Sequence, residues 1–288
     1  MKTIKKIFCG ALALTMLFAL TACSTSSAVT VADAVKKLND VKSMSYVMDL
    51  QMDMSIMGQA IRTSTFASAE YIANPLALKL DMDISSGAVS QKALTYAAAE
   101  GDKLLLYSST DGGETWFAQE SDSLAALEQY DAKSSFNLYA RSAPSFKEAG
   151  AETVDGAEAL RFDGVINGDA LRDVLASSGM DDQLSSLGLD LNAADLFSGF
   201  KDGVPISIWV DQSSGLPKKY EMDMTSMMNA LMKNLFASLA ASTGEEIPEE
   251  ALSLTVDKVL VGVTISAYDN VTEIIIPEAA LNTPRAPQ

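Results

Sequence analysis

The chain has 288 residues, of which 48% are hydrophobic and 20% charged, and this is the composition of a folded protein and not of a disordered one. Its formal net charge of −17 argues against binding to the phosphate backbone of a nucleic acid, so we expect no nucleic-acid partner. The chain contains no histidine, which excludes Ser-His and Cys-His catalysis, histidine-ligated zinc sites and a histidine pH switch.

Residues 1–22 have the pattern of a bacterial export signal. Three lysines precede an apolar run at 7–20, which is too short to span a bilayer comfortably, and the sequence LTAC occupies 20–23. Small residues before a cysteine at the end of such a run are typical of a lipobox. We therefore expect Cys23 to receive acyl chains, such as palmitate, and to become the first residue of a mature lipoprotein. An ordinary secretory signal with a chance cysteine is the alternative.

Acyl chains on Cys23 would anchor the mature protein at the extracytoplasmic face of the cell membrane, because each buried CH₂ group contributes about 0.8 kcal/mol. The other cysteine, Cys9, lies in the leader, so the mature chain would have neither a free thiol nor a disulfide. Loss of the leader and its three lysines changes the net charge from −17 to −20. An anionic membrane surface repels so acidic a body, and we expect small, polar residues at 23–30 to form a flexible tether.

The mature chain begins with a short amphipathic helix and continues mainly with strands. Apolar residues at 48–57 alternate with aspartate, glutamine and serine, which predicts a strand with one apolar and one polar face. Similar segments follow, separated by glycine-containing turn signals. The predicted strands cover 48–57, 61–71, 76–84, 91–100, 104–109, 114–119, 146–154, 157–165, 204–210, 218–224, 252–268 and 271–276.

Helices are fewer, and we predict them at 31–41, 121–139, 168–178 and 226–240. The apolar phase of the segment at 252–268 reverses near Lys258, which indicates a bulge or a bend. Many strands with few helices predict an α+β fold in which one curved antiparallel sheet is covered by helices on its apolar face. We expect a single domain over 31–280 and a flexible tail at 281–288.

Several short motifs, taken together and in order, carry a resemblance to a known family. They are KSMSY at 42–46, DGGETW at 111–116, WVD at 209–211, GLP at 215–217, YDNV at 268–271 and IIIPE at 274–278. The set resembles uncharacterised lipoproteins of Gram-positive bacteria in the LolA/LppX-like superfamily, over about 40–280. The resemblance implies an incomplete antiparallel β-barrel with an apolar cavity, in which relatives carry lipids or lipoproteins. Other members of the superfamily bind protein partners as regulators.

Methionine is unusually abundant, with 12 residues in the mature chain, gathered mainly at 44–57 and 222–232. Its flexible, polarisable side chain suits an adaptable pocket, but it also fills ordinary core between a sheet and helices. Both interpretations stay open. If the strands form a half-barrel, the residues expected to line its cavity are Met48, Leu50, Met52, Met54, Leu78, Leu80, Met82, Met222 and Met224.

The sequence contains no clear catalytic motif. Ser198 and Lys201 match the S-x-x-K pattern of acyl-serine enzymes, but the companion motifs of those enzymes are absent. Aspartates on the strands at 48–57 and 76–84 could act as acid and base or bind a hard cation, although a solvated strand face is the simpler interpretation. We therefore expect no enzymatic activity, no cofactor and no metal site.

The function predicted from these observations is that of a membrane-anchored extracytoplasmic lipoprotein. It would bind a lipid or another hydrophobic molecule in the cavity of the half-barrel. The alternative is a cell-envelope interaction or regulatory protein that binds a protein partner through its outer surface, for example at an exposed aromatic patch around Trp116 or Trp209.

Overall fold

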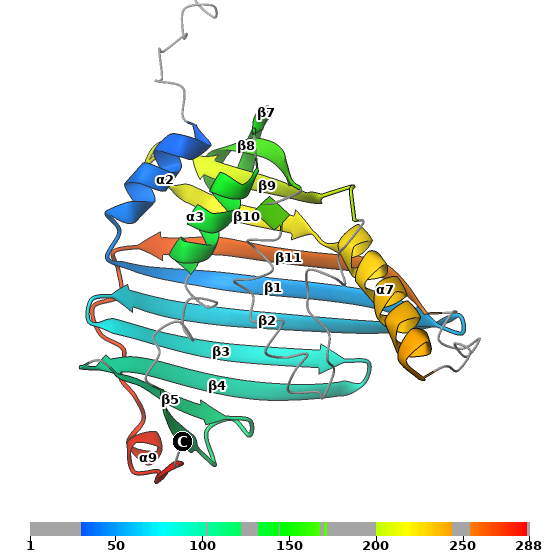
Figure 1. Ribbon diagram of the computed structural model, residues 1–288. Helices are drawn as coiled ribbons and strands as arrows, with labels where there is room; N and C mark the ends of the chain where they lie inside the picture. Colours follow the sequence, from blue (N-terminus) through cyan, green and yellow to red (C-terminus); the bar gives the residue numbers. More distant parts are fainter. Residues whose placement is uncertain are drawn as a thin grey trace, which may run out of the picture.

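The computed structural model describes residues 30–101, 103–121, 132–143, 145–167, 170–171, 200–243 and 254–286. Within these ranges, twelve strands form one sheet in the order β12-β6-β5-β4-β3-β2-β1-β11-β10-β9-β8-β7. Neighbouring strands are antiparallel, apart from the short parallel pair of β12 and β6. The sheet is not closed, because β12 and β7 lie at its two margins (Figure 1). The α+β half-barrel predicted from the sequence is therefore confirmed.

Each of the strands β1 to β11 overlaps a strand predicted from the alternation of apolar and polar residues. Their bounds, with those of β12, are β1 Ser43–Ile56, β2 Gln59–Ala73, β3 Leu76–Ser86, β4 Val89–Glu100, β5 Lys103–Ser109, β6 Phe117–Ser121, β7 Lys147–Val154, β8 Ala157–Ile166, β9 Val204–Asp211, β10 Pro217–Asp223, β11 Thr255–Tyr268 and β12 Arg285–Ala286. The first strand along the chain, β1, pairs with the last long strand along the chain, β11. This pairing joins the two halves of the chain into one sheet.

Three of the described helices lie over one face of the sheet, as Figure 1 shows: α2 Val31–Asn39, α3 Ala132–Ser142 and α7 Thr225–Thr243. The helices predicted at 31–41 and 226–240 are confirmed. For the helix predicted at 121–139, the described part is helical from Ala132 onward, as α3. Residues 122–131, and all of the helix predicted at 168–178 except 170–171, lie outside the described residues. None of the described helices is both long and apolar enough to cross a membrane.

The pairing register assigns the strand residues to two faces. Met48 of β1 lies opposite Ala67 of β2, and Ala67 lies opposite Met82 of β3, so these three residues share a face. This face packs against the helices, because Leu38 of α2 and Phe136 of α3 belong to the same apolar cluster as the buried residues of these strands. We call it the inner face, and its opposite the outer face.

Charged side chains gather on the outer face. In β1 to β6 and β11, the register and the side-chain contacts place every described charged residue on that side. Ion pairs link residues that lie opposite one another on neighbouring strands, namely Asp53–Arg62 at 2.9 Å, Glu70–Lys79 at 3.6 Å and Asp83–Lys92 at 3.4 Å. Exposed pairs of this kind contribute only about 0–1 kcal/mol each, so they help to fix the register more than the stability.

The register of β11 shifts once near its start. Asp53 of β1 lies opposite Lys258, whereas the next residue, Met54, lies opposite Val256. The intervening Asp257 is exposed and accepts a hydrogen bond from the Ser55 hydroxyl at 2.5 Å. The extra residue is a bulge, and the bulge predicted near Lys258 is confirmed.

The segment after β11 covers the outer face of β4 to β6. A second apolar cluster lies there and consists of Tyr96, Leu105, Tyr107, Trp116, Ala118 and Ala280. Ile274 and Ile276 pack against it, whereas Ile275 between them is 75% exposed. The strand predicted at 271–276 is wrong, because this alternation reflects packing onto the cluster and the segment pairs with no strand.

Residues near the C-terminus, as far as residue 286, contact the sheet. The short helix α9 Glu278–Leu281 contributes Ala280, which is 0% exposed, to the outer cluster. Arg285 in β12 pairs with Glu120 at 3.1 Å and with Glu100 at 3.5 Å, and β12 lies beside β6. These contacts join residues far apart in the sequence, and the flexible tail at 281–288 stays a prediction.

Candidate functional site

The residues predicted to line a cavity share the inner face. Met48, Leu50, Met52 and Met54 occupy successive inward positions of β1, which is the strand next to the middle of the sheet. Leu78, Leu80 and Met82 occupy inward positions of β3. Met222 of β10 lies opposite Val261, which in turn lies opposite Leu50, and Met224 follows directly after β10. The structure thus brings together on one surface residues from three strands.

Burial divides these nine residues into two groups. Leu78, Leu80 and Met222 are 1%, 0% and 5% exposed, and they belong to the sealed core beneath the helices. The other six are only partly buried, namely Met48, Leu50, Met52, Met54, Met82 and Met224. These six are the better candidates for contact with a ligand. Their role in binding stays a prediction.

Sequence reasoning missed several residues of the same surface. Val259, Val261 and Val263 of β11 lie opposite Met52, Leu50 and Met48 and extend the apolar surface beyond β1. The alternation of valines after Lys258 was the signal that could have identified them. Hydroxyl-bearing residues were also missed. Threonines and serines share the inward phase of β2, β4 and β5, but the predicted lining contained only methionine and leucine.

The inner face combines this apolar surface with an absence of charge. In β1 to β6 and β11, none of the described inward residues is aspartate, glutamate, lysine or arginine. Among the residues that the structure describes, no group of three or more cysteine, aspartate or glutamate side chains is placed to hold a metal ion. Chemically, such a surface can exclude water and contact hydrocarbon, but it offers no counter-ion to a buried charge.

The aspartates considered as acid–base pairs lie on the outer face. Asp53 is paired with Arg62 and Asp83 with Lys92, and each partner comes from the neighbouring strand. Asp49 on β1 and Asp81 on β3 lie on the same outer side of the sheet. They are therefore separated from the inner face by the thickness of the sheet. Ser198, of the S-x-x-K match, lies outside the described residues.

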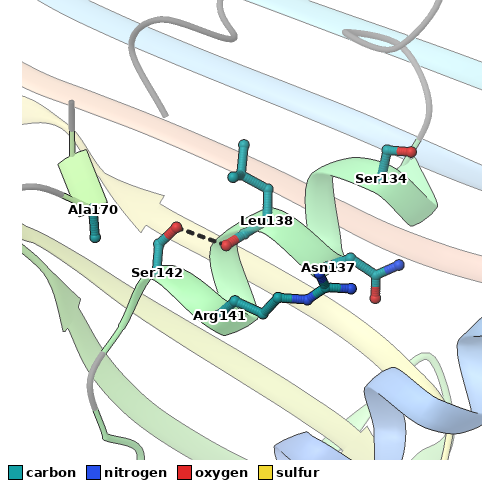
Figure 2. Close-up of a pocket in the computed structure, with 6 residues that line it drawn as sticks. All are labelled: Ser134, Asn137, Leu138, Arg141, Ser142 and Ala170. Atoms are coloured by element: carbon teal, nitrogen blue, oxygen red, sulfur yellow. Dashed lines mark hydrogen bonds between the residues drawn. The ribbon is translucent and has the colours of Figure 1, made fainter. Parts of the chain in front are cut away.

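A polar pocket of about 490 Å³ lies beside α3, and Figure 2 shows the residues that line it. They are Ser134, Asn137, Leu138, Arg141, Ser142 and Ala170. The opposite side of α3 bears Phe136, whose ring packs against Tyr220 at a centroid distance of 6.1 Å. The side-chain amide of Asn137 donates to Asn39 Oδ1 at 3.1 Å, which ties α3 to the end of α2. The pocket therefore lies on the side of α3 away from the core.

A smaller hollow of about 170 Å³ lies on the outer face around Gly262. Gly262 of β11 stands between Asp49 of β1 and Glu221 of β10, and its missing side chain opens the hollow. Lys219 occupies the rim and pairs with Glu221 at 2.9 Å. Its lining is polar and charged, in contrast to the inner face.

Both tryptophans are buried. Trp116, 8% exposed, donates from its indole to the Gly113 carbonyl at 3.0 Å and packs against Tyr96. Trp209, 4% exposed, donates to Glu152 at 2.7 Å, and this hydrogen bond is the main cause that lowers the pKa of the Glu152 carboxyl. Lys219 covers its ring, with Nζ 4.6 Å from the centroid. The exposed aromatic patch predicted around these residues is wrong, because Trp116 is buried in the outer apolar cluster and polar side chains from other strands cover Trp209.

Residues 28–144 match the model of a family of unknown function (DUF6612). Among solved structures, the chain is similar to the lipoprotein LppX of Mycobacterium tuberculosis, with 14% identity and a TM-score of 0.45 over 85% of this chain and 96% of that one.

Two further structures are similar at comparable identity. LprF from Mycobacterium bovis is 10% identical, with a TM-score of 0.44 over 87% of this chain and 95% of that one. A DUF1329 family protein from Desulfovibrio piger is 11% identical, with a TM-score of 0.27 over 84% of this chain and 92% of that one. The search of curated proteins finds no match to this chain.

Proposed function

We propose that this protein is a non-enzymatic lipoprotein of the cell envelope that binds a lipid or another hydrophobic molecule against the inner face of its sheet. The acyl chains on Cys23 anchor it to the extracytoplasmic face of the membrane. Its mature acidic body stands off from the bilayer on the tether at 23–30. In this proposal the helices and the sheet enclose the hydrocarbon part of the ligand.

One observation carries the proposal. The inward residues of seven strands are uncharged, and a group of them, including Met52, Met54 and Met82, is only partly buried. Apolar side chains that stay exposed to water inside a half-barrel are unfavourable, at about 25 cal/mol per Å² of exposed apolar surface. A hydrocarbon chain laid against them removes that surface from water. Thioethers suit this role because they adapt to ligands of different shape.

The proposal is tested with the mature chain carrying Cys23→Ser, which removes the acylation site and leaves no cysteine. Mass spectrometry of an organic extract of the purified protein is expected to find an acyl lipid. After delipidation, a fluorescent acyl probe is expected to bind in a saturable manner. Protein that carries no lipid and takes up no probe would contradict the proposal.

A matched pair of variants locates the binding surface. Met52→Lys places an ammonium group on the inner face of β1, whereas Phe66→Lys places one on the outer face of the adjacent β2, at a residue that is 49% exposed. Probe affinity is expected to fall at least tenfold in M52K and to stay unchanged in F66K, because a buried ammonium without a partner is costly. Equal affinities of the two variants would place the ligand elsewhere.

A further inference from the structure

The inner face carries hydroxyl groups in a row that is otherwise apolar. Thr95 of β4 lies directly opposite Ser108 of β5, and on its other side Thr95 lies opposite Leu80 of β3. Both hydroxyl residues are partly buried. Within the part of the chain that the structure describes, neither hydroxyl has a hydrogen-bond partner. Elsewhere on this face, Thr63 is hydrogen-bonded at 3.2 Å to Ser86, whereas Thr65 of β2 stands singly between Leu50 and Ile84.

The position of this hydroxyl pair relative to the methionines defines an amphipathic site. The methionines of β1 lie three strand positions away from β4 and the valines of β11 lie four, at about 4.8 Å per strand. On the far side of Ser108, Phe117 of β6 lies opposite it and is 65% exposed. Across the inner face, the methionines of β1 and the valines of β11 are thus followed by the adjacent hydroxyls on β4 and β5, and then by an accessible aromatic ring on β6.

The described inward residues of β1 to β6 and β11 carry no charge, and this restricts what can lie against them. A carboxylate or phosphate placed beside Thr95 would lose its hydration, and the inward residues of the flanking strands would provide no cation in return. An alcohol or ester oxygen is less costly to desolvate, and it can accept a hydrogen bond from a threonine or serine hydroxyl or donate one to it.

From these observations we infer that the site selects uncharged acyl lipids whose polar part is an alcohol or an ester, such as a monoacylglycerol. This inference rests on the proposed function and deepens it. The acyl chain lies along the methionines of β1 and the valines of β11. The oxygen atoms of the ligand bond to Thr95 and Ser108, which act as specificity-determining residues. A fatty-acid anion with the same acyl chain is discriminated against.

The first test compares ligands that differ only in their polar part. Monooleoylglycerol and oleate are each used to displace a fluorescent acyl probe from the delipidated mature chain carrying Cys23→Ser, at alkaline pH where oleate is ionised. Monooleoylglycerol is expected to bind at least tenfold more tightly than oleate. Comparable binding of the two would overturn the inference while leaving the proposed function intact. Binding of neither ligand, nor of the probe, would overturn both.

The second test assigns the preference to the hydroxyl pair. The double variant T95V/S108A keeps the shape of the site and removes both hydroxyls, and its affinity for monooleoylglycerol is expected to fall about tenfold, as for one or two lost hydrogen bonds. Its affinity for a fluorescent alkyl probe that carries no oxygen atom is expected to stay unchanged. The conservative variant Thr95→Ser is expected to retain the wild-type preference.

The control for this test carries the same change on the other face. Thr264 of β11 lies on the outer side of the sheet, opposite Lys219 of β10, and Thr264→Val is expected to leave the affinity for both ligands unchanged. Thermal unfolding by circular dichroism shows whether each variant is folded. A folded T95V/S108A protein that binds monooleoylglycerol as tightly as T264V does would overturn the assignment of these residues.

Discussion

Met48 and Met82 stand on either side of Ala67 in one row across the inner face of the sheet. Both methionines are partly buried, whereas Leu80, the next inward residue on β3, is 0% exposed. The inner face therefore changes from sealed core to accessible surface within two residues of a single strand. This boundary separates the residues that hold the fold together from those available to a ligand.

The boundary predicts different effects for two alanine substitutions on β3. Leu80→Ala is expected to lower the free energy of unfolding by about 2–5 kcal/mol, because it leaves a cavity in the sealed core. Met82→Ala is expected to cost less stability, about 1–2 kcal/mol, because the methionine is already partly exposed. Urea unfolding monitored by circular dichroism measures both values.

Ligand binding is expected to respond in the opposite order. The affinity for a fluorescent acyl probe should fall more in M82A than in L80A, because of these two side chains only Met82 is partly exposed on the inner face. Equal losses of stability, or a larger loss of affinity in L80A, would show that the boundary does not lie between these two positions.

Much of this face could be predicted from the sequence, because alternation determines which residues share a side of a strand. The phase of β1 and β3 placed all seven of their predicted lining residues on one surface, and the reversal near Lys258 located the bulge of β11. Alternation could not predict the boundary between Leu80 and Met82. That boundary depends on where the helices pack, which is a property of contacts distant in the sequence.

The failures have the same physical origin. The residues at 271–276 have the composition of a strand, but a strand also needs a partner edge, and this segment packs side-on against the outer cluster. Trp209 is apolar enough to suggest a docking patch, but Glu152 and Lys219 cover it from other strands. A local pattern reports the preference of a segment, whereas its partners are decided by the tertiary structure.

The turn after β5 is expected to make stability depend on pH. Asp111 accepts hydrogen bonds from the Thr115 hydroxyl and backbone, from the Glu114 backbone at 3.0 Å and from the Ser109 hydroxyl at 2.7 Å. These bonds, led by that from the Thr115 hydroxyl, hold the pKa of the Asp111 carboxyl well below its ordinary value. A lowered pKa means that the contribution to stability is present above about pH 4 and is lost as the pH falls below it.

Asp111→Asn removes the charge and keeps the shape of the side chain. The variant is expected to be less stable than the wild type near neutral pH, and the difference is expected to shrink as the pH falls below about 4. Urea unfolding at a series of pH values measures this trend. Trp116 lies at the end of the same turn, so its fluorescence reports local opening. A difference that stays constant across the series would assign the effect to geometry instead of ionisation.

Membrane attachment is expected to depend on Cys23 alone among the residues of the chain. Replacement by alanine removes the sulfur that is proposed to carry acyl chains, and burial of such chains in a bilayer would make the attachment stable. In cells expressing the full-length chain, Cys23→Ala is expected to abolish the incorporation of labelled palmitate and to release the protein from the membrane fraction. Cys9→Ala is the matched control and is expected to change neither. Labelling that persists in C23A would contradict acylation at this residue.

The C-terminal segment is expected to stabilise the margin of the sheet. A chain that ends at residue 277 lacks α9 and β12, so Ala280 no longer seals the outer cluster and β6 becomes an unpaired edge. We expect a lower midpoint of urea unfolding, a red shift in the emission of Trp116 and a tendency to aggregate, because exposed edges pair with other chains. A chain that ends at residue 286 keeps both elements and is expected to behave as the wild type. If both truncated chains unfold at the wild-type midpoint, the segment adds nothing to the stability of the sheet. The ion pairs of Arg285 with Glu100 and Glu120 would then not contribute to the free energy of unfolding.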